Sequence, residues 1–82
     1  MDIAVRMEHL GNEDESLVSA GIIYMNLDHP LYRTYQNNDD LLTLHLARII
    51  TKELALQTGI TDAQQAFAIQ SDLLTDALKQ NK

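Results

Sequence analysis

The chain changes from strand-like to helix-like patterning within Asn26-Leu27-Asp28-His29-Pro30-Leu31-Tyr32-Arg33. An apolar run from Gly21 to Met25 precedes this segment and is typical of a β-strand, and two long segments with helical periodicity follow it. Asp28 is suited to cap a helix, and Pro30 fixes φ in the first turn of a short helix over residues 30–35. The segment therefore joins the two halves of the fold, and it holds most of the side chains that can bind a ligand.

Two strands are predicted before this junction. Residues 3–7 place Ile3, Val5 and Met7 on one face, and residues 17–27 form the strongest strand candidate. The polar residues 11–16 between them are typical of a turn or loop. The expected pairing is an antiparallel hairpin, which is only marginally stable alone, so helices or a second chain must cover it.

A long helix is predicted soon after the junction. Asn38 or Asp39 can cap a helix over residues 40–58, and Gly59 is suited to end it. Thr61-Asp62-Ala63-Gln64 then matches the capping box, in which Thr61 and Gln64 satisfy each other's backbone donors.

A last helix is therefore expected over residues 62–80, joined to the preceding one by a link so short that the two should run antiparallel. The predicted fold class is α+β, in one small domain of residues 1–82. It consists of an N-terminal β-hairpin or short strands, a short helix, and a C-terminal antiparallel two-helix hairpin.

The two long helices differ in their apolar surfaces. The last one is amphipathic, and its apolar residues fall on one half of the cylinder: Ala63, Ala66, Phe67, Ile69, Leu73, Leu74, Ala77 and Leu78. The preceding one is apolar on nearly every side. One stripe comprises Leu42, Leu46, Ile49, Ile50 and Leu56, and a second set extends it: Leu41, Leu44, Ala47, Leu54 and Ala55.

A helix that is apolar all round is usually buried on more than one face. Either the strands cover its second face, or another protomer or domain does. The second alternative predicts a homodimer or an intramolecular partner domain, with Leu41, Leu44, Ala47 and Ala55 as the interface candidates.

Composition narrows the possible functions. A net charge of −6, with six Lys and Arg against twelve Asp and Glu, argues against nucleic-acid binding. The acidity is concentrated in residues 1–16, which we interpret as a solvated loop rather than a surface for cations or basic partners. The absence of cysteine excludes disulfides and thiolate metal sites.

No apolar run approaches the ~20 residues of a membrane span, and no secretory signal pattern opens the chain. A cytoplasmic protein that does not contact the membrane is expected.

The candidate ligand-binding residues gather at the junction: Asn26, Asp28, His29, Tyr32 and Arg33. A histidine beside carboxylates can act as a general base or a pH sensor. The alternative is that Asn26, Asp28 and His29 only hydrogen-bond the backbone of a sharp turn and cap the short helix. His45 has no metal-ligand partner at helical spacing, so we expect it on the helix surface or in an interface.

No serine lies in a nucleophile elbow and the three glycines are isolated, so no catalytic residue, metal or cofactor is predicted. The leading interpretation is a non-catalytic interaction or dimerisation domain. The alternative is a small enzyme or ligand-binding protein with its site around Asp28, His29, Tyr32 and Arg33.

Two motifs carry a resemblance. Residues 22–32 contain the pattern I-x-x-N-x-x-H-P, and residues 44–55 contain the helix pattern L-A-R-x-I-x-x-E-L-A. Over residues 22–78 the chain resembles the C-terminal part of large prokaryotic ATPases of the gyrase, histidine-kinase and MutL type. The resemblance implies that this chain is the C-terminal module of a larger ATP-binding protein. It also implies no ATPase activity in the chain itself, because the acidic-Asn helix motif and the Gly-rich lid are absent from these residues.

Overall fold

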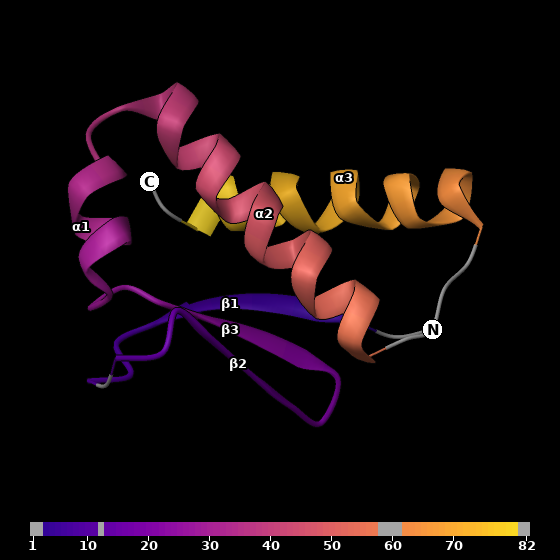
Figure 1. Cartoon of the computed structure of the whole chain (residues 1–82), viewed down its shortest axis with the longest axis horizontal. Coiled ribbons are helices and arrows are strands. Elements are labelled where there is room, and N and C mark those ends of the chain that lie inside the picture. Colours follow the sequence, from indigo (N-terminus) through magenta and orange to yellow (C-terminus); the bar gives the residue numbers. More distant parts are fainter. Residues whose placement is uncertain (1–2, 12, 58–61, 81–82) are drawn as a thin grey trace.

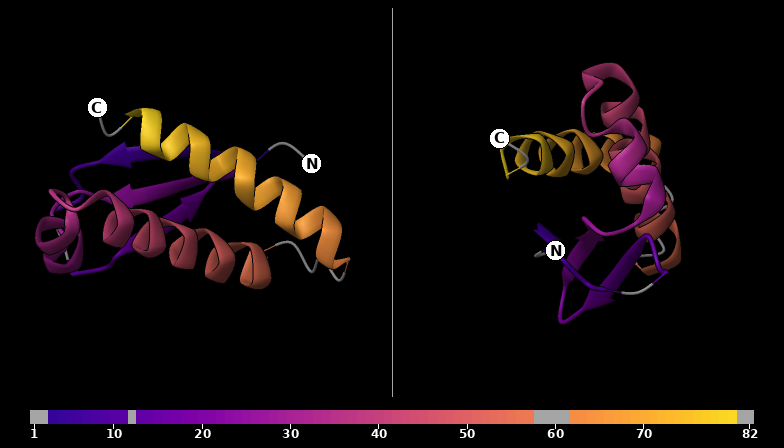
Figure 2. Two further views of the ribbon diagram at one scale, coloured as in Figure 1. Left: turned by 90° about the horizontal axis from the view of Figure 1, so that it is seen from above. Right: turned by 90° about the vertical axis from the view of Figure 1, so that its left-hand side faces the viewer.

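The computed structural model describes residues 3–11, 13–57 and 62–80. One layer is a three-stranded sheet and the other consists of helices that lie over a single face of it (Figure 1). The elements, in chain order, are β1 (Ala4–Glu8), β2 (Ser16–Ser19), β3 (Ile22–Asn26), α1 (Pro30–Tyr35), α2 (Asp39–Gln57) and α3 (Ala63–Gln80). The helices α2 and α3 run in opposite directions (Figure 2). The predicted α+β class is confirmed.

The pairing of the strands differs from the prediction. Residues 17–27 are not one strand, because Ala20 and Gly21 both adopt positive φ (51° and 78°) and turn the chain back on itself. Two central residues with positive φ are the signature of a tight two-residue hairpin turn. The antiparallel hairpin therefore forms between β2 and β3, and β1 pairs with the other side of β3 in parallel. The expected antiparallel hairpin of β1 with the 17–27 strand was wrong.

The inner face of the sheet follows from this register. Val5 and Val18 both lie opposite Ile23, so one row of β-branched side chains crosses all three strands beneath the helices. The side chains of Leu42, Leu46, Ile49, Ile50, Leu54, Leu73 and Ala77 fill the core from above. The sheet and α3 cover two sides of α2.

The buried stripe of α2 includes a different leucine from the one expected. Leu54 is 5% exposed, whereas Leu56, which the periodicity assigned to the stripe, is 70% exposed. Leu54 follows Ile50 by four residues and lies on the side of α2 where α3 packs, so α3 buries it. On α3, Phe67 is likewise 69% exposed although it belongs to the apolar half of that helix.

The helix starts show which polar residues act as caps. His29, and not Asp28, caps α1, because its Nδ1 accepts the Leu31 amide at 3.1 Å. Asn38 caps α2 as one of the two predicted choices, with Oδ1 accepting the Leu41 amide at 3.1 Å. Asp62 accepts two amides at the start of α3, from residues 64 and 65. The roles predicted for Gly59 and Thr61 lie outside the described residues.

The end of α3 binds the outer edge of the sheet. The Gln80 side chain accepts from the Met7 amide (3.1 Å) and donates to the Val5 carbonyl (2.9 Å). Val5 and Met7 are the β1 residues whose backbone groups point away from β3. The Gln80 side-chain amide thus pairs with the Met7 amide and the Val5 carbonyl, as the backbone of a further strand would.

Candidate functional site

Asn26 is the central hydrogen-bonding residue of the strand–helix junction. It ends β3 with its side chain buried. Its Oδ1 accepts from the amides of Leu10 (3.1 Å) and Asp28 (2.9 Å), and its Nδ2 donates to the Asp14 carbonyl (2.8 Å). Because these bonds go to backbone groups, the Asn26 side chain holds the loop around Leu10 and Asp14 to the junction.

Asp28 binds residues of the loop after β1 and of α1. Its Oδ1 accepts from His9 Nδ1 (2.8 Å) and Arg33 (3.4 Å), and its Oδ2 accepts from the Gly11 amide (2.9 Å). The hydrogen bond from His9, with help from the Gly11 amide and Arg33, lowers the pKa of Asp28. Since the ionised carboxylate only accepts, a neutral His9 carries its proton on Nδ1 and leaves Nε2 available.

A polar hollow of about 300 Å³ lies beside this pair, lined by His9, Leu27, Tyr32, Arg33 and Gln36. Of the five predicted ligand-binding residues, only Tyr32 and Arg33 line it. Asn26 and His29 serve the backbone instead, and Asp28 orients His9. Sequence reasoning missed His9, because nothing in its own neighbourhood signals a partner 19 residues away.

The residues of the polar hollow are suited to two kinds of chemistry. An imidazole oriented by a carboxylate can accept a proton at Nε2, and a guanidinium can bind an anion. The described lining residues include no Ser, Thr or Cys that could act as a nucleophile. Its volume equals the lower limit of about 300–1,000 Å³ for small-molecule pockets. The geometry therefore admits a small ligand.

His45 was expected on the helix surface or in an interface, and the first of these alternatives was wrong. It is 5% exposed, with its ring stacked near His29 and edge-on to Tyr35 at centroid distances of 6.5 and 5.9 Å. Arg48 donates to His45 Nδ1 at 3.4 Å, so the neutral ring keeps its proton on Nε2. Burial lowers the pKa of His45, and the positive charge of Arg48 lowers it further. His45 is therefore a neutral residue of α2 that packs against α1 and the residue that caps it.

Glu15 shows that the acidic loop is not simply solvated. It accepts from Arg48 (3.1 and 2.5 Å) and from Lys52 (3.0 Å), which tie the loop before β2 to the middle of α2. The two Arg48 bonds, followed by those of Lys52, lower the pKa of Glu15 to about 2. Lys52 also donates to Ser16, whose hydroxyl donates to the buried Glu53. The interpretation of this loop as free and solvated was wrong for Glu15.

Three of the four interface candidates lie on the outer surface. Leu44 is 67% exposed, and Leu41 and Ala55 are exposed as well. Ala47 is half-buried beside α3, and its carbonyl accepts from Gln70 at 3.4 Å. The outward side of α2 therefore presents leucine side chains that no described part of the chain covers.

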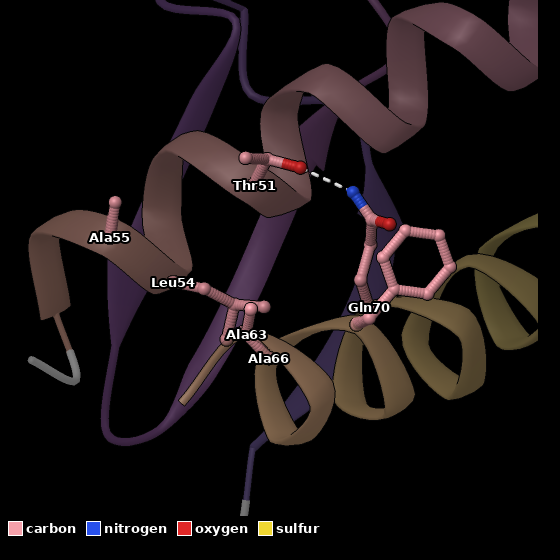
Figure 3. A pocket seen from close by; sticks show the side chains of 7 residues that line it. Thr51, Leu54, Ala55, Ala63, Ala66 and Gln70 are labelled. Carbon is pink, nitrogen blue, oxygen red and sulfur yellow. Dashed lines mark hydrogen bonds between the residues drawn. The ribbon is translucent and has the colours of Figure 1, made fainter. Parts of the chain in front are cut away.

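A second hollow lies where α2 ends and α3 begins (Figure 3). This apolar groove, of about 250 Å³, is lined by Thr51, Leu54, Ala55, Ala63, Ala66, Phe67 and Gln70. Gln70 Nε2 donates to the Thr51 hydroxyl across it, so the two polar side chains bind one another. The rest of its lining is apolar.

Among residues 3–11, 13–57 and 62–80, no group of three or more His, Asp or Glu side chains could hold a metal ion. In the same part of the chain, no helix is long and apolar enough to cross a bilayer. Comparison of the chain with protein-family models, curated proteins and solved structures gives no match.

Proposed function

We propose that this chain is a non-catalytic association domain that pairs through the outward surface of its two C-terminal helices. The observation that supports the proposal is the exposure of Leu44, Leu56 and Phe67, each by about two thirds of its surface. Burying a leucine or phenylalanine side chain contributes roughly 1.5–3 kcal/mol. Large exposed apolar side chains of this kind are found at interaction sites on soluble domains.

The hydrogen bonds of the strand–helix junction also support a non-catalytic function. Its most chemical-looking residues bind backbone: Asn26 holds Leu10 and Asp28, and His29 caps α1. An asparagine and a histidine committed to such bonds have little capacity left for a substrate.

Sedimentation velocity of the whole chain, from micromolar to submillimolar concentration, tests the proposal. We expect a concentration-dependent shift from the 9.3 kDa monomer to twice that mass. A clean monomer across the whole range would contradict self-association.

The resemblance to the gyrase, histidine-kinase and MutL type extends this proposal to a larger protein, of which the chain would be the C-terminal module. The motif residues Asn26 and His29 support a structural reading of that pattern, because they hold the strand–helix junction. An ATP-binding domain encoded in the same reading frame would support the extension, and an intact upstream stop codon would contradict it.

Absence of catalysis and of nucleic-acid binding belongs to the same proposal. ATP turnover by the isolated chain should not exceed a buffer blank. Low-salt gel shifts with DNA and RNA should show no complex, because the acid excess gives phosphates few partners. Turnover, or salt-sensitive micromolar binding, would contradict it.

A second candidate function is the binding of a small anion in the polar hollow. The observation that favours it is the placement of Arg33 beside a His9 ring whose orientation Asp28 fixes. An NMR titration with acetate and with inorganic phosphate tests it. Saturable shifts at Tyr32 and Arg33 that vanish in Arg33→Gln would support a ligand site, and unchanged spectra would exclude one for these anions.

A further inference from the structure

The apolar groove lies in the least charged part of an acidic chain. Between Glu53 and Asp72 the sequence contains a single charged residue, Asp62, although the chain carries a net charge of −6. The same segment supplies the two most exposed large apolar side chains, Leu56 and Phe67. Interface cores are depleted of charge and often contain aromatic residues, and this segment is nearly uncharged and exposes the Phe67 ring.

The groove offers an apolar space for a side chain. Its volume is about 250 Å³, and its lining is apolar apart from Thr51 and Gln70. Small side chains, those of Ala55, Ala63 and Ala66, form much of its wall, and Figure 3 shows Ala63 and Ala66 at the start of α3, beside Leu54 of α2. Gln70 Nε2 donates to the Thr51 hydroxyl and to the Ala47 carbonyl, so its donors are directed at the chain itself and not into the groove.

A protruding ring and a groove that could receive one therefore occur on a single surface. Phe67 lines the groove and is 69% exposed. A two-fold contact requires this arrangement, because the same patch must supply both complementary features.

We propose that the groove is occupied by a second copy of this chain, with the Phe67 ring of each protomer entering the groove of the other about a two-fold axis. This inference rests on the proposed association function, and it names the partner and the contact. The residues that line the groove carry no charge, so a basic partner would find no acidic group to pair with there. Two chains of net charge −6 repel one another elsewhere, and they approach at lowest cost where neither carries charge.

Phe67→Ala removes the ring from both halves of the contact. Because each contact occurs twice, we expect the dimer to weaken about 100- to 1,000-fold, as for the loss of two aromatic anchors. Leu17→Ala is the matched control, since Leu17 on β2 is 48% exposed and does not line the groove. It should change the dissociation constant less than about 3-fold, as expected outside the central anchors.

Ala66→Leu fills the groove while it adds apolar surface. Unspecific apolar association predicts a tighter dimer for this variant, whereas insertion of Phe67 predicts a weaker one. Thermal melts of each variant at low concentration confirm that the fold is retained.

Mixing the two variants gives the sharpest result. Phe67→Ala keeps an open groove, and Ala66→Leu keeps the ring, so one of the two insertions can form in a mixed pair. We expect the mixture to contain more dimer than either variant alone.

The outcomes separate the two levels of the proposal. A monomeric wild type overturns the association function itself. A wild-type dimer that Phe67→Ala leaves intact, that Leu17→Ala weakens equally, or that Ala66→Leu tightens overturns only the groove contact. A mixture with no more dimer than its components also overturns the two-fold insertion.

Discussion

The strand–helix junction and the apolar groove lie near opposite ends of α2, and they use their side chains in opposite ways (Figure 1). At the junction, the side chains of Asn26 and Asp28 form hydrogen bonds with residues 9–14, which are far from them in the sequence. At the groove, Leu56 and Phe67 are left largely exposed. The residues that look suited to chemistry thus hold the fold together, and residues of ordinary core type are the ones available to a partner.

Asn26→Ala should have the largest effect on stability. It removes three hydrogen bonds and leaves the Leu10 and Asp28 amides without their side-chain acceptor. We expect a loss of about 2–4 kcal/mol in the free energy of unfolding. Urea denaturation measures it, with the exposed Asn37→Ala as a control that should stay within about 0.5 kcal/mol. Equal stability of the two variants would break the contrast between junction and surface.

Glu15→Gln should have the next largest effect. Its pKa of about 2 in the folded chain lies below the ordinary 4.5. The stabilisation is therefore complete above pH 4.5 and is lost as the pH falls from there toward 2. Because Arg48 is half-exposed, we discount the ion pair to about 1–2 kcal/mol. Stability measured at pH 7, 4 and 2.5 should show this acid loss in the wild type and a flatter profile in the variant.

His45 should add a weaker dependence at higher pH. Burial lowers the pKa of His45 in the folded chain, so the unfolded chain binds the proton first as the pH falls below 6.5. Stability should decline there by at most about 1.4 kcal/mol per pH unit, the limit for one proton. The groups around the ring are His29, Tyr35, Arg48 and Glu15. His45→Phe should flatten the profile between pH 7 and 5, and an unchanged slope would assign it to another group.

Phe67→Ala should have the smallest effect on the monomer. A buried phenylalanine costs about 3–5 kcal/mol when truncated, whereas a surface substitution stays within about 0.5 kcal/mol. The exposure of Phe67 predicts the second value for melts at concentrations where the chain is monomeric. A loss above 2 kcal/mol would mean that this ring belongs to the core, and the contrast between the two regions would fail.

The elements themselves could be predicted from periodicity and capping residues. The alternation of apolar residues predicted β1, and Pro30 and Asn38 predicted where α1 and α2 begin. The strand order could not, because one hidden turn at Ala20 and Gly21 divides an apolar run that reads as a single strand.

The candidate site was harder to predict because its contacts join distant segments. His9 reaches Asp28 across 19 residues, and Glu15 reaches Arg48 across 33. The choice of Leu54 over Leu56 for the core depends on the side of α2 where α3 packs. Such choices are made by tertiary packing, and no local pattern records them.

The contact of Gln80 with β1 has a consequence for solubility. An unpaired strand edge is a template on which other chains can add strands, and natural sheets protect such edges. Here the last turn of α3 occupies the Met7 amide and the Val5 carbonyl with one amide side chain. Fraying of that turn would expose this donor and this acceptor to another strand. We therefore expect the end of α3 to limit strand addition at this edge, and Gln80 is the residue through which it does so.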